Sequence, residues 1–257
     1  MKLSGHPRST EHGGLEERRL VTTHKRALGL AAAALGTIVL WQFAVGRYVL
    51  YPFTIFATWF HEMGHGLCAA ALGGSFVELR LFPDGSGYAI YSAARSLSRP
   101  GIALVAAAGP AGPALAGTLL ILVSMRPGWS RVSLSGLAVV MLASAVAWIR
   151  SLFGAGVIGL LALVLLLIAV KGNDWWRSLA LQFTGVQACV SIFLQIGYLF
   201  TERVPMSGRF VYSDTGQIAQ ALFLPYWFWA VVLAGLTLWL PAWGLARALR
   251  VARASSR

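Results

Sequence analysis

Apolar residues in this chain gather in long runs, rather than in the narrow stripes typical of helices on the surface of soluble domains. Crossing the roughly 30 Å hydrocarbon core of a bilayer takes about 20 consecutive apolar residues in a helix. Seven runs come close to this length: 27–46, 48–72, 102–125, 134–149, 152–170, 178–199 and 222–246. The pattern predicts an all-α polytopic membrane protein with about seven transmembrane helices.

The segment after the second run changes to a period of two. Val77, Leu79 and Leu81 alternate with charged residues, as in a strand with one buried face. The stretch 83–87 (PDGSG) supplies turn residues, and 88–91 returns as a partner strand. We therefore expect a small β-hairpin after the second helix, on the cytosolic side of the membrane.

Composition agrees with a membrane protein, because 57% of the 257 residues are hydrophobic and only 12% are charged. The net charge of +12 comes from basic residues that flank the apolar runs, as interfacial anchors do, so we expect no nucleic acid partner. We divide the chain into a polar basic cytosolic tail (1–26), a membrane-embedded domain (27–246) and a basic C-terminal tail (247–257). Both cysteines fall in apolar runs, which argues against a disulfide framework.

The basic N-terminal tail predicts a multi-pass protein of the cell membrane with a cytoplasmic N-terminus. Seven spans then place the arginines after residue 246 outside, against the positive-inside trend. Merging 134–170 into one span would give six spans, but would leave Arg150 in mid-membrane at a cost of about 2.5–3.5 kcal/mol. We keep seven spans, with six as the alternative.

The second run contains the sequence HEMGH, in which His61 and His65 are four residues apart. On a helix both imidazoles lie on one face and can bind one zinc ion, while Glu62 lies beside it and can handle the proton of an attacking water. The plain alternative is a chance match in which the histidines are core residues. Histidine and glutamate are scarce here, and ionisable residues within a span are functional by default, so we favour the metal site. Cys68 is a possible fourth ligand, but a small core residue is the simpler interpretation.

With this motif, the chain resembles the site-2 proteases, which are zinc metalloproteases that cut peptide bonds within the membrane. The resemblance also rests on the hairpin after HEMGH, on Gly109-Pro110 in the next span and on Ser213-Asp214-Thr215 late in the chain. The short bacterial members without a PDZ domain are the most similar. Two features differ: Pro113 stands where the family often has asparagine, and the usual Leu-Asp-Gly ligand motif is missing.

The resemblance implies an HExxH-type zinc metalloendopeptidase. Its substrate would be a single-span membrane protein, such as an anti-sigma factor or a signal-peptide remnant, cut in or near its transmembrane segment. Glu62 would be the catalytic base and then the acid. A substrate helix has to unwind first, and the hairpin around Glu78, Leu79 and Tyr88 would hold the unwound stretch as an added strand.

A third zinc ligand is needed, because catalytic zinc usually takes three protein ligands. With seven spans, Asp214 lies on the same side as His61 and His65, whereas Asp174 lies on the opposite side. Asp84 is on the correct side but fits a turn better than a ligand. Asp214 has its own alternative, a capping box with Gln217 that opens the last helix. The tail histidines are further candidates: His6, His12 and His24.

Gln217 is a candidate substrate contact, although a polar residue at the membrane interface would look the same. The competing function is a non-proteolytic zinc-binding membrane protein, either a transporter or a pseudoenzyme that binds membrane helices. A transporter would carry ionisable residues along several spans, and spans three to six have almost none. A pseudoenzyme would have lost Glu62 or a histidine. The sequence gives no indication of an oligomeric state.

Overall fold

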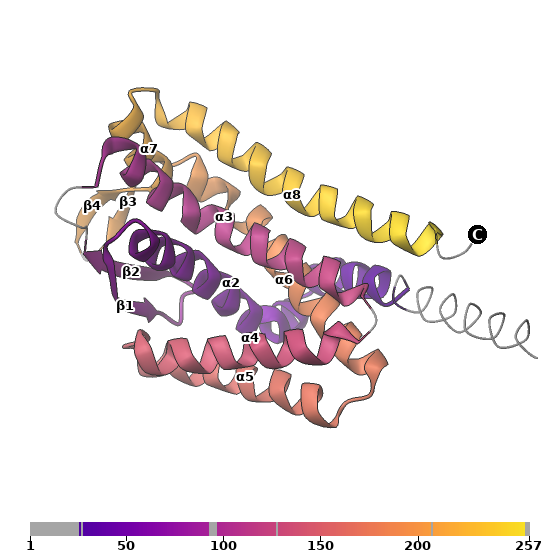
Figure 1. Ribbon diagram of the computed structural model, residues 1–257. Helices are drawn as coiled ribbons and strands as arrows, with labels where there is room; N and C mark the ends of the chain where they lie inside the picture. The colour runs from indigo at the N-terminus through magenta and orange to yellow at the C-terminus, as the bar shows by residue number, and fades with distance from the viewer. Residues whose placement is uncertain (1–25, 27, 93–96, 127, 207, 255–257) are drawn as a thin grey trace, which may run out of the picture.

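The computed structural model describes residue 26 and residues 28–92, 97–126, 128–206 and 208–254 (Figure 1), and the chain is mostly helical. A first helix, Leu28–Trp41, precedes the labelled elements. The helices that follow are α2 (Ala44–Ala71), α3 (Arg99–Ser124), α4 (Trp129–Ala147), α5 (Leu152–Lys171), α6 (Asp174–Leu199), α7 (Asp214–Leu222) and α8 (Tyr226–Ala254). The strands are β1 (Ser75–Leu81), β2 (Gly87–Ser92), β3 (Arg203–Met206) and β4 (Arg209–Tyr212).

Each of the seven apolar runs is largely helical, although the first run crosses the break before α2 and the last crosses the turn before α8, and the helices are not seven equivalent spans. Five helices are long and apolar enough to cross a membrane: α3, α4, α5, α6 and α8. The Leu28–Trp41 helix and α2 qualify only together, as a pair bent by 118° at a short break, which would make a sixth span. The chain is therefore a membrane protein by its helices, while the count of seven is not confirmed.

The bend between the first helix and α2 has a local cause in Gly46. A Cβ atom on Gly46 would lie 1.9 Å from the carbonyl oxygen of Leu40, so only glycine lets the first turn of α2 approach the preceding helix this closely. The residues between the two helices form a turn, in which the N–H of Phe43 donates to that same Leu40 carbonyl.

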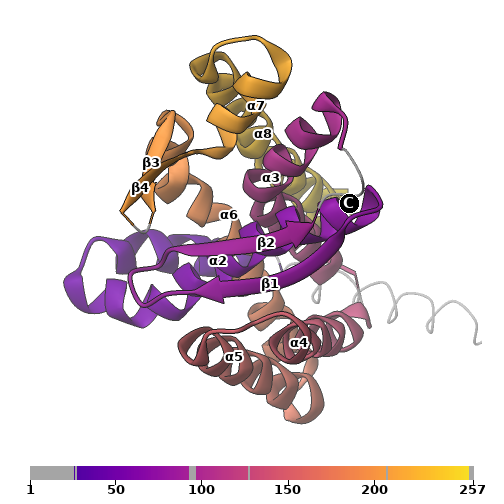
Figure 2. The same ribbon diagram turned by 90° about the vertical axis from the view of Figure 1, so that its left-hand side faces the viewer.

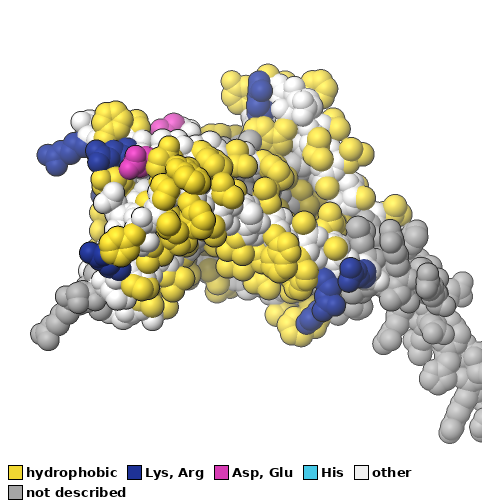
Figure 3. Space-filling view, turned by 90° about the horizontal axis from the view of Figure 1, so that it is seen from above, with side chains coloured by type: hydrophobic (Ala, Val, Ile, Leu, Met, Phe, Trp, Pro, Cys, Tyr) yellow, Lys and Arg dark blue, Asp and Glu magenta, His cyan; other side chains and the backbone are white. Residues whose placement is uncertain are grey.

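The apolar core joins helices that are distant in the sequence. Phe56 and Trp59 of α2 are fully buried against Leu134 and Met141 of α4 and Ile158 of α5. The outward faces of these helices are also apolar, as in a helix bundle surrounded by lipid: Leu152 is 95% exposed. Figure 3, which looks at the molecule from the α8 side, shows a face with many hydrophobic side chains and with basic side chains at its margins.

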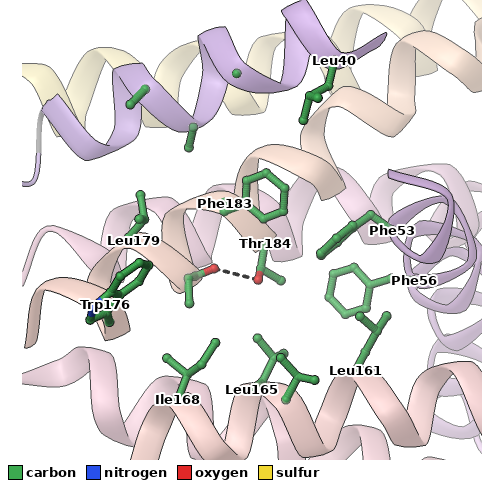
Figure 4. A pocket seen from close by; sticks show the side chains of 15 residues that line it. Leu40, Phe53, Phe56, Leu161, Leu165, Ile168, Trp176, Leu179, Phe183 and Thr184 are labelled. Atoms are coloured by element: carbon green, nitrogen blue, oxygen red, sulfur yellow. Dashed lines mark hydrogen bonds between the residues drawn. The ribbon is translucent and has the colours of Figure 1, made fainter. Parts of the chain in front are cut away.

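A separate apolar cavity of about 420 Å³ lies between the Leu28–Trp41 helix, α2, α5 and α6 (Figure 4). Phe53 and Phe56 line one end and Trp176 the other, with Phe183 between them. Its one hydroxyl, on Thr184, donates to the backbone carbonyl of Ala180 at 2.7 Å. The lining is therefore almost entirely apolar, with the indole of Trp176 as its other polar side chain, and it contains none of the candidate site residues.

The predicted hairpin is present: β1 and β2 pair antiparallel, with Leu79 opposite Ala89. Its turn is tied to α2, because the Thr58 hydroxyl donates to the Gly85 carbonyl at 2.7 Å and the Tyr51 hydroxyl donates to the Pro83 carbonyl. The chain also forms a second antiparallel hairpin, β3–β4, which the sequence analysis did not predict. Figure 2 shows the first hairpin lying across α2, with the second hairpin beside it at the same end of the bundle.

Candidate metal centre and substrate cleft

The HEMGH sequence lies in the second half of α2, where that helix packs closely on α3. Gly64 makes this packing possible, because a Cβ atom there would lie 2.2 Å from the carbonyl oxygen of Ala108. Gly112 of α3 plays the same part from the other side, because a Cβ atom there would lie 2.5 Å from the carbonyl oxygen of Phe60. The close helix pair buries His61, Glu62 and His65 away from lipid, as ionisable groups at membrane depth require.

Asp214 reaches the histidines from α7, a short helix that begins at this residue. The cap of α7 is Ser213, whose Oγ accepts a hydrogen bond from the Gly216 N–H at 3.1 Å. The alternative in which Asp214 only caps the last helices is therefore wrong. Its side chain is free of that role and is 2% exposed.

Three ligand atoms meet at this point. His61 Nε2 lies 3.0 Å from Asp214 Oδ2, and His65 Nε2 lies 3.3 Å from Asp214 Oδ1. One ligand atom from each of the three residues can be chosen so that all lie within 4.8 Å of one another. Two ligands of a tetrahedral zinc, each about 2.0–2.1 Å from the ion, are themselves about 3.3 Å apart. The donor set and its spacing fit a zinc ion.

The surroundings orient these ligands. The Nδ1 of His65 lies 2.8 Å from the carbonyl oxygen of Val105 on α3, so Nδ1 carries the proton and Nε2 presents its lone pair to the centre. Gly109 of α3 lies directly against the pair. A Cβ atom on Gly109 would lie 2.2 Å from His65 Nε2 and 2.8 Å from His61 Nε2. Glycine keeps open the space in front of the two nitrogens.

Charge at the centre favours an ionised ligand. Burial raises the pKa of the Asp214 carboxyl, but the nearby His65 and His61 outweigh burial and hold this pKa below its usual range. Asp214 is therefore a carboxylate, the form that binds metal. Glu62 is also buried, but it is outside the group of three and faces the backbone N–H of Ala89 on β2.

The remaining ligand candidates lie elsewhere. Asp84 occupies the hairpin turn, where the hydroxyl and N–H of Ser86 both donate to its Oδ1 and lower the pKa of its carboxyl. Asp174 pairs with Arg177 at the start of α6, and the 26 residues of α6 separate it from the centre. Cys68 is unpaired and is not in the metal-binding group. The tail histidines lie outside the described residues, as does the tail itself up to residue 25.

A cleft passes the metal centre. It consists of two cavities, of about 710 and 930 Å³, and both are lined by His61, Glu62, Tyr88 and Tyr198. Gln217 lines the smaller one. Two residues expected to contact substrate do not line either cavity: Glu78, which pairs with Arg80, and Leu79, which is fully buried.

Several residues of this centre carried no usable signal in the sequence. Val105 contributes only a backbone carbonyl, and Gly109 contributes only the lack of a side chain. Tyr198 lies at the end of an apolar run, where tyrosine is common at a membrane interface in any case. Each becomes visible only when α2, α3 and α6 are assembled.

A comparison with known families identifies one match. The model of a family described as Peptidase M50B-like matches residues 30–244, a range that contains every residue of the candidate centre. No curated protein and no solved structure matches the chain.

Proposed function

Because the chain belongs to the peptidase M50B-like family, we propose that it is an intramembrane zinc metalloprotease that hydrolyses a peptide bond in or near the transmembrane segment of a membrane protein. One observation carries this proposal: His61, His65 and Asp214 bring three ligand atoms together beside a buried glutamate. The family model supports a membrane metallopeptidase, and the intact set of ligands and base supports catalysis by this member.

His61, His65 and Asp214 would hold the zinc ion, for which their spacing is suitable. A zinc ion at this place supplies Lewis-acid chemistry, which polarises a carbonyl and makes water more acidic. The chain itself supplies the orientation: Val105 fixes the tautomer of His65, and the close packing of α2 on α3 excludes lipid from the centre.

Glu62 handles the proton. Its carboxylate accepts a proton from the attacking water as the water oxygen bonds to the scissile carbon, and then returns that proton to the leaving amine as the C–N bond breaks. Its position supports this role, since it lines both cavities of the cleft next to the ligand His61. One water is consumed for each peptide bond, and the products are a carboxylic acid and an amine.

The free edge of the first hairpin is suited to an extended substrate. The outer edge of β1 is already used: the Leu79 N–H donates to the Trp148 carbonyl at 2.8 Å, and the Arg150 N–H donates to the Leu79 carbonyl at 2.9 Å. Since Leu79 turns both backbone groups away from β2, its opposite residue Ala89 turns its own groups away from β1, toward the cleft. A substrate strand added to β2 would therefore lie beside Glu62.

The proposed substrate is accordingly a membrane-protein segment that has lost its helical hydrogen bonds at the cleavage site. Unwinding exposes the scissile carbonyl, and pairing with β2 replaces the lost backbone hydrogen bonds. Tyr88 and Gln217 both line the cleft that holds the centre and would contact this segment. This substrate class covers the membrane anchors of anti-sigma factors and signal-peptide remnants.

The test is cleavage by the purified chain in liposomes that contain a model single-span substrate. We expect cleavage by the unsubstituted chain and none by Glu62→Gln, with zinc content equal in both. Glu202→Gln is the matched control, because Glu202 is exposed on the loop before β3 and should leave cleavage unchanged. Equal cleavage by Glu62→Gln would contradict the proposal. Zinc binding without cleavage by the unsubstituted chain, across substrates, would favour a non-proteolytic zinc protein.

A further inference from the structure

The two cavities of the cleft meet in a short shared wall. His61 and Glu62 belong to it, and so do the hydroxyl-bearing side chains of Tyr88 and Tyr198. Gly87 and Val204 also belong to both linings, so a substrate that occupies both cavities would lie next to all of these residues. A peptide bond within reach of Glu62 is therefore also near the two tyrosines.

Tyr198 lies directly against the metal centre. Its ring centroid is 6.2 Å from that of His61, and the two rings are nearly perpendicular, at 75°. The side chain is half-buried, and its hydroxyl faces Asp214. The phenol thus lies near two of the three candidate zinc ligands, although it comes from α6, which supplies none of them.

The backbone holds Tyr198 and Asp214 in a fixed relation. The buried Thr215 hydroxyl donates to the carbonyl of Leu199 at 2.8 Å, which ties the residue after Asp214 to the residue after Tyr198. The N–H of Ser213 donates to the carbonyl of Glu202 at 2.9 Å and closes the same loop. These bonds fix the backbone that carries Tyr198 relative to Asp214, so that less of the chain has to be ordered when the side chain binds a reacting group.

Hydrolysis of a peptide is faster when a hydrogen-bond donor lies at the scissile carbonyl oxygen, because that oxygen gains negative charge when water attacks. The smaller cavity is lined by other donors, including Tyr91 and Arg209, but Tyr198 is the one among the described residues whose ring lies against the ligand His61. The hydroxyl of Tyr212 is contacted by Arg203 at 2.7 Å, and the Gln217 amide points to the Tyr212 carbonyl. Tyr88 lies on β2 next to Ala89, whose N–H Glu62 faces, so it comes from the same strand that would pair with the substrate. Tyr198 comes from α6, a different element of the cleft.

We propose that Tyr198 is a catalytic residue of the proposed protease, whose hydroxyl donates a hydrogen bond to the scissile carbonyl oxygen as negative charge develops there. The water oxygen bonds to the carbonyl carbon, the π electrons move to the carbonyl oxygen, and Glu62 takes the water proton. When the C–N bond breaks, those electrons re-form the carbonyl, and Glu62 protonates the amine. Tyr198 keeps its proton throughout and stabilises the charged state. This role depends on the proposed peptidase activity.

The test compares Tyr198→Phe with the unsubstituted chain in the liposome assay. Loss of one such donor lowers kcat by about 10²–10³-fold in a hydrolase. We expect a decrease of about 100-fold in kcat, with KM and zinc content unchanged. Affinity for a phosphonamidate peptide that mimics the charged state should fall, while affinity for the uncleaved substrate stays the same. Tyr48→Phe is the control, because Tyr48 is 82% exposed on α2 and should behave like the unsubstituted chain.

Two results would overturn this role alone. A kcat within about threefold of the unsubstituted value would mean that no bond to the reacting oxygen is lost, since even a weak neutral hydrogen bond is worth about that factor. A fall in zinc content together with kcat would make Tyr198 a residue that positions Asp214. If the unsubstituted chain binds zinc but cleaves nothing, the peptidase activity itself is refuted, and the role of Tyr198 with it.

Discussion

At the scale of single residues, the contact of Asp214 with two imidazoles predicts a sharp difference between aspartate and asparagine. Asp214→Asn keeps the shape of the side chain but replaces a carboxylate with a neutral amide, which is a poor zinc ligand. We expect zinc affinity to fall by more than about tenfold and cleavage to be lost. Zinc content and cleavage of a model substrate, measured on the same preparation, check this.

Asp84→Asn is the matched control for that substitution. Asp84 accepts from Ser86 in the hairpin turn, and asparagine can accept the same hydrogen bonds. We expect normal zinc content and normal cleavage. If instead the Asp84 variant loses zinc and the Asp214 variant retains it, the third zinc ligand is Asp84 in the hairpin, and Asp214 is not a ligand.

Gly109 offers a second residue-scale prediction, which tests space rather than charge. In Gly109→Ala the added methyl group would lie 2.2 Å from His65 Nε2, so that nitrogen has to move away from the centre. Changing a residue that positions a metal ligand typically lowers metal affinity by about 10- to 100-fold. We expect a loss of this size in a zinc titration. Gly235→Ala on α8 is the control, because nothing lies within 4 Å of its ideal Cβ position. Equal affinities in the two variants would show that the space in front of Gly109 holds no ion.

Part of this candidate centre could be predicted from the sequence. His61, Glu62 and His65 lie within five residues on one helix, so local geometry alone brings them together. Asp214 was a candidate only through the assumed topology, and its competing role as a cap was excluded by Ser213 in the folded chain. Val105 acts through a carbonyl group and Gly109 through a missing side chain, and such contributions depend on packing between helices.

At the scale of elements, the free edge of β2 is the feature most directly tied to the substrate. Ala89→Pro removes the N–H that this edge presents to the cleft, and leaves the β1–β2 hydrogen bonds intact because Leu79 opposite makes none to β2. We expect KM for a membrane substrate to rise about tenfold, the effect of losing one hydrogen bond to an ordered strand, and kcat to fall as well, because Glu62 faces the same N–H. Kinetics of the reconstituted chain measure this.

Ala89→Ser retains the N–H with a side chain of similar size and should keep the original KM. Zinc content is measured in both variants, to show that the centre is intact. A proline variant that cleaves as well as the serine variant, with the same KM, would exclude strand addition to β2 as the mode of substrate binding.

Other elements show where pattern reasoning stops. The first hairpin was predictable from its alternation and its Pro-Asp-Gly turn. The second hairpin has two strands of four residues, largely exposed, and such short strands lack a buried face that would leave a pattern. The 118° bend before α2 was also missed, because apolar residues continue across it and its cause is the contact of Gly46 with Leu40.

At the scale of the whole molecule, different elements lie at the two ends of the helix bundle. Both hairpins and α7 lie at one end, whereas the C-terminal end of α8 lies at the other (Figure 1). If the bent pair forms one span, six crossings place both termini on the same side and the hairpins on the opposite side. A cytoplasmic N-terminus and a cytosolic hairpin are then mutually exclusive, although the seven-span interpretation combined them.

The distribution of charge favours the cytoplasmic N-terminus. Both tails are basic, and the connections of α3 to α4 and of α5 to α6 at the same end add Arg126, Arg131, Lys171 and Arg177. Placing this end in the cytoplasm satisfies the positive-inside trend for both termini, which seven spans do not. The cleft would then open near the opposite face of the membrane.

Reporter fusions test this arrangement. We expect reporters after Gly172 and after Ala254 to be cytoplasmic, and one after Phe210, in the second hairpin, to lie outside. Seven spans with a cytoplasmic N-terminus predict the reverse for all three positions. Reporters after Gly172 and Phe210 on the same side would show that α6 is not a single crossing.

The most direct measurement of the central claim is zinc coordination in the purified chain, by metal analysis together with X-ray absorption at the zinc edge. We predict about one zinc per chain with two histidine nitrogens and a carboxylate oxygen among its ligands. The ion should persist in Glu62→Gln and be lost in the double variant His61→Ala, His65→Ala. Full zinc occupancy in that double variant would place the metal elsewhere and contradict the assignment of this centre.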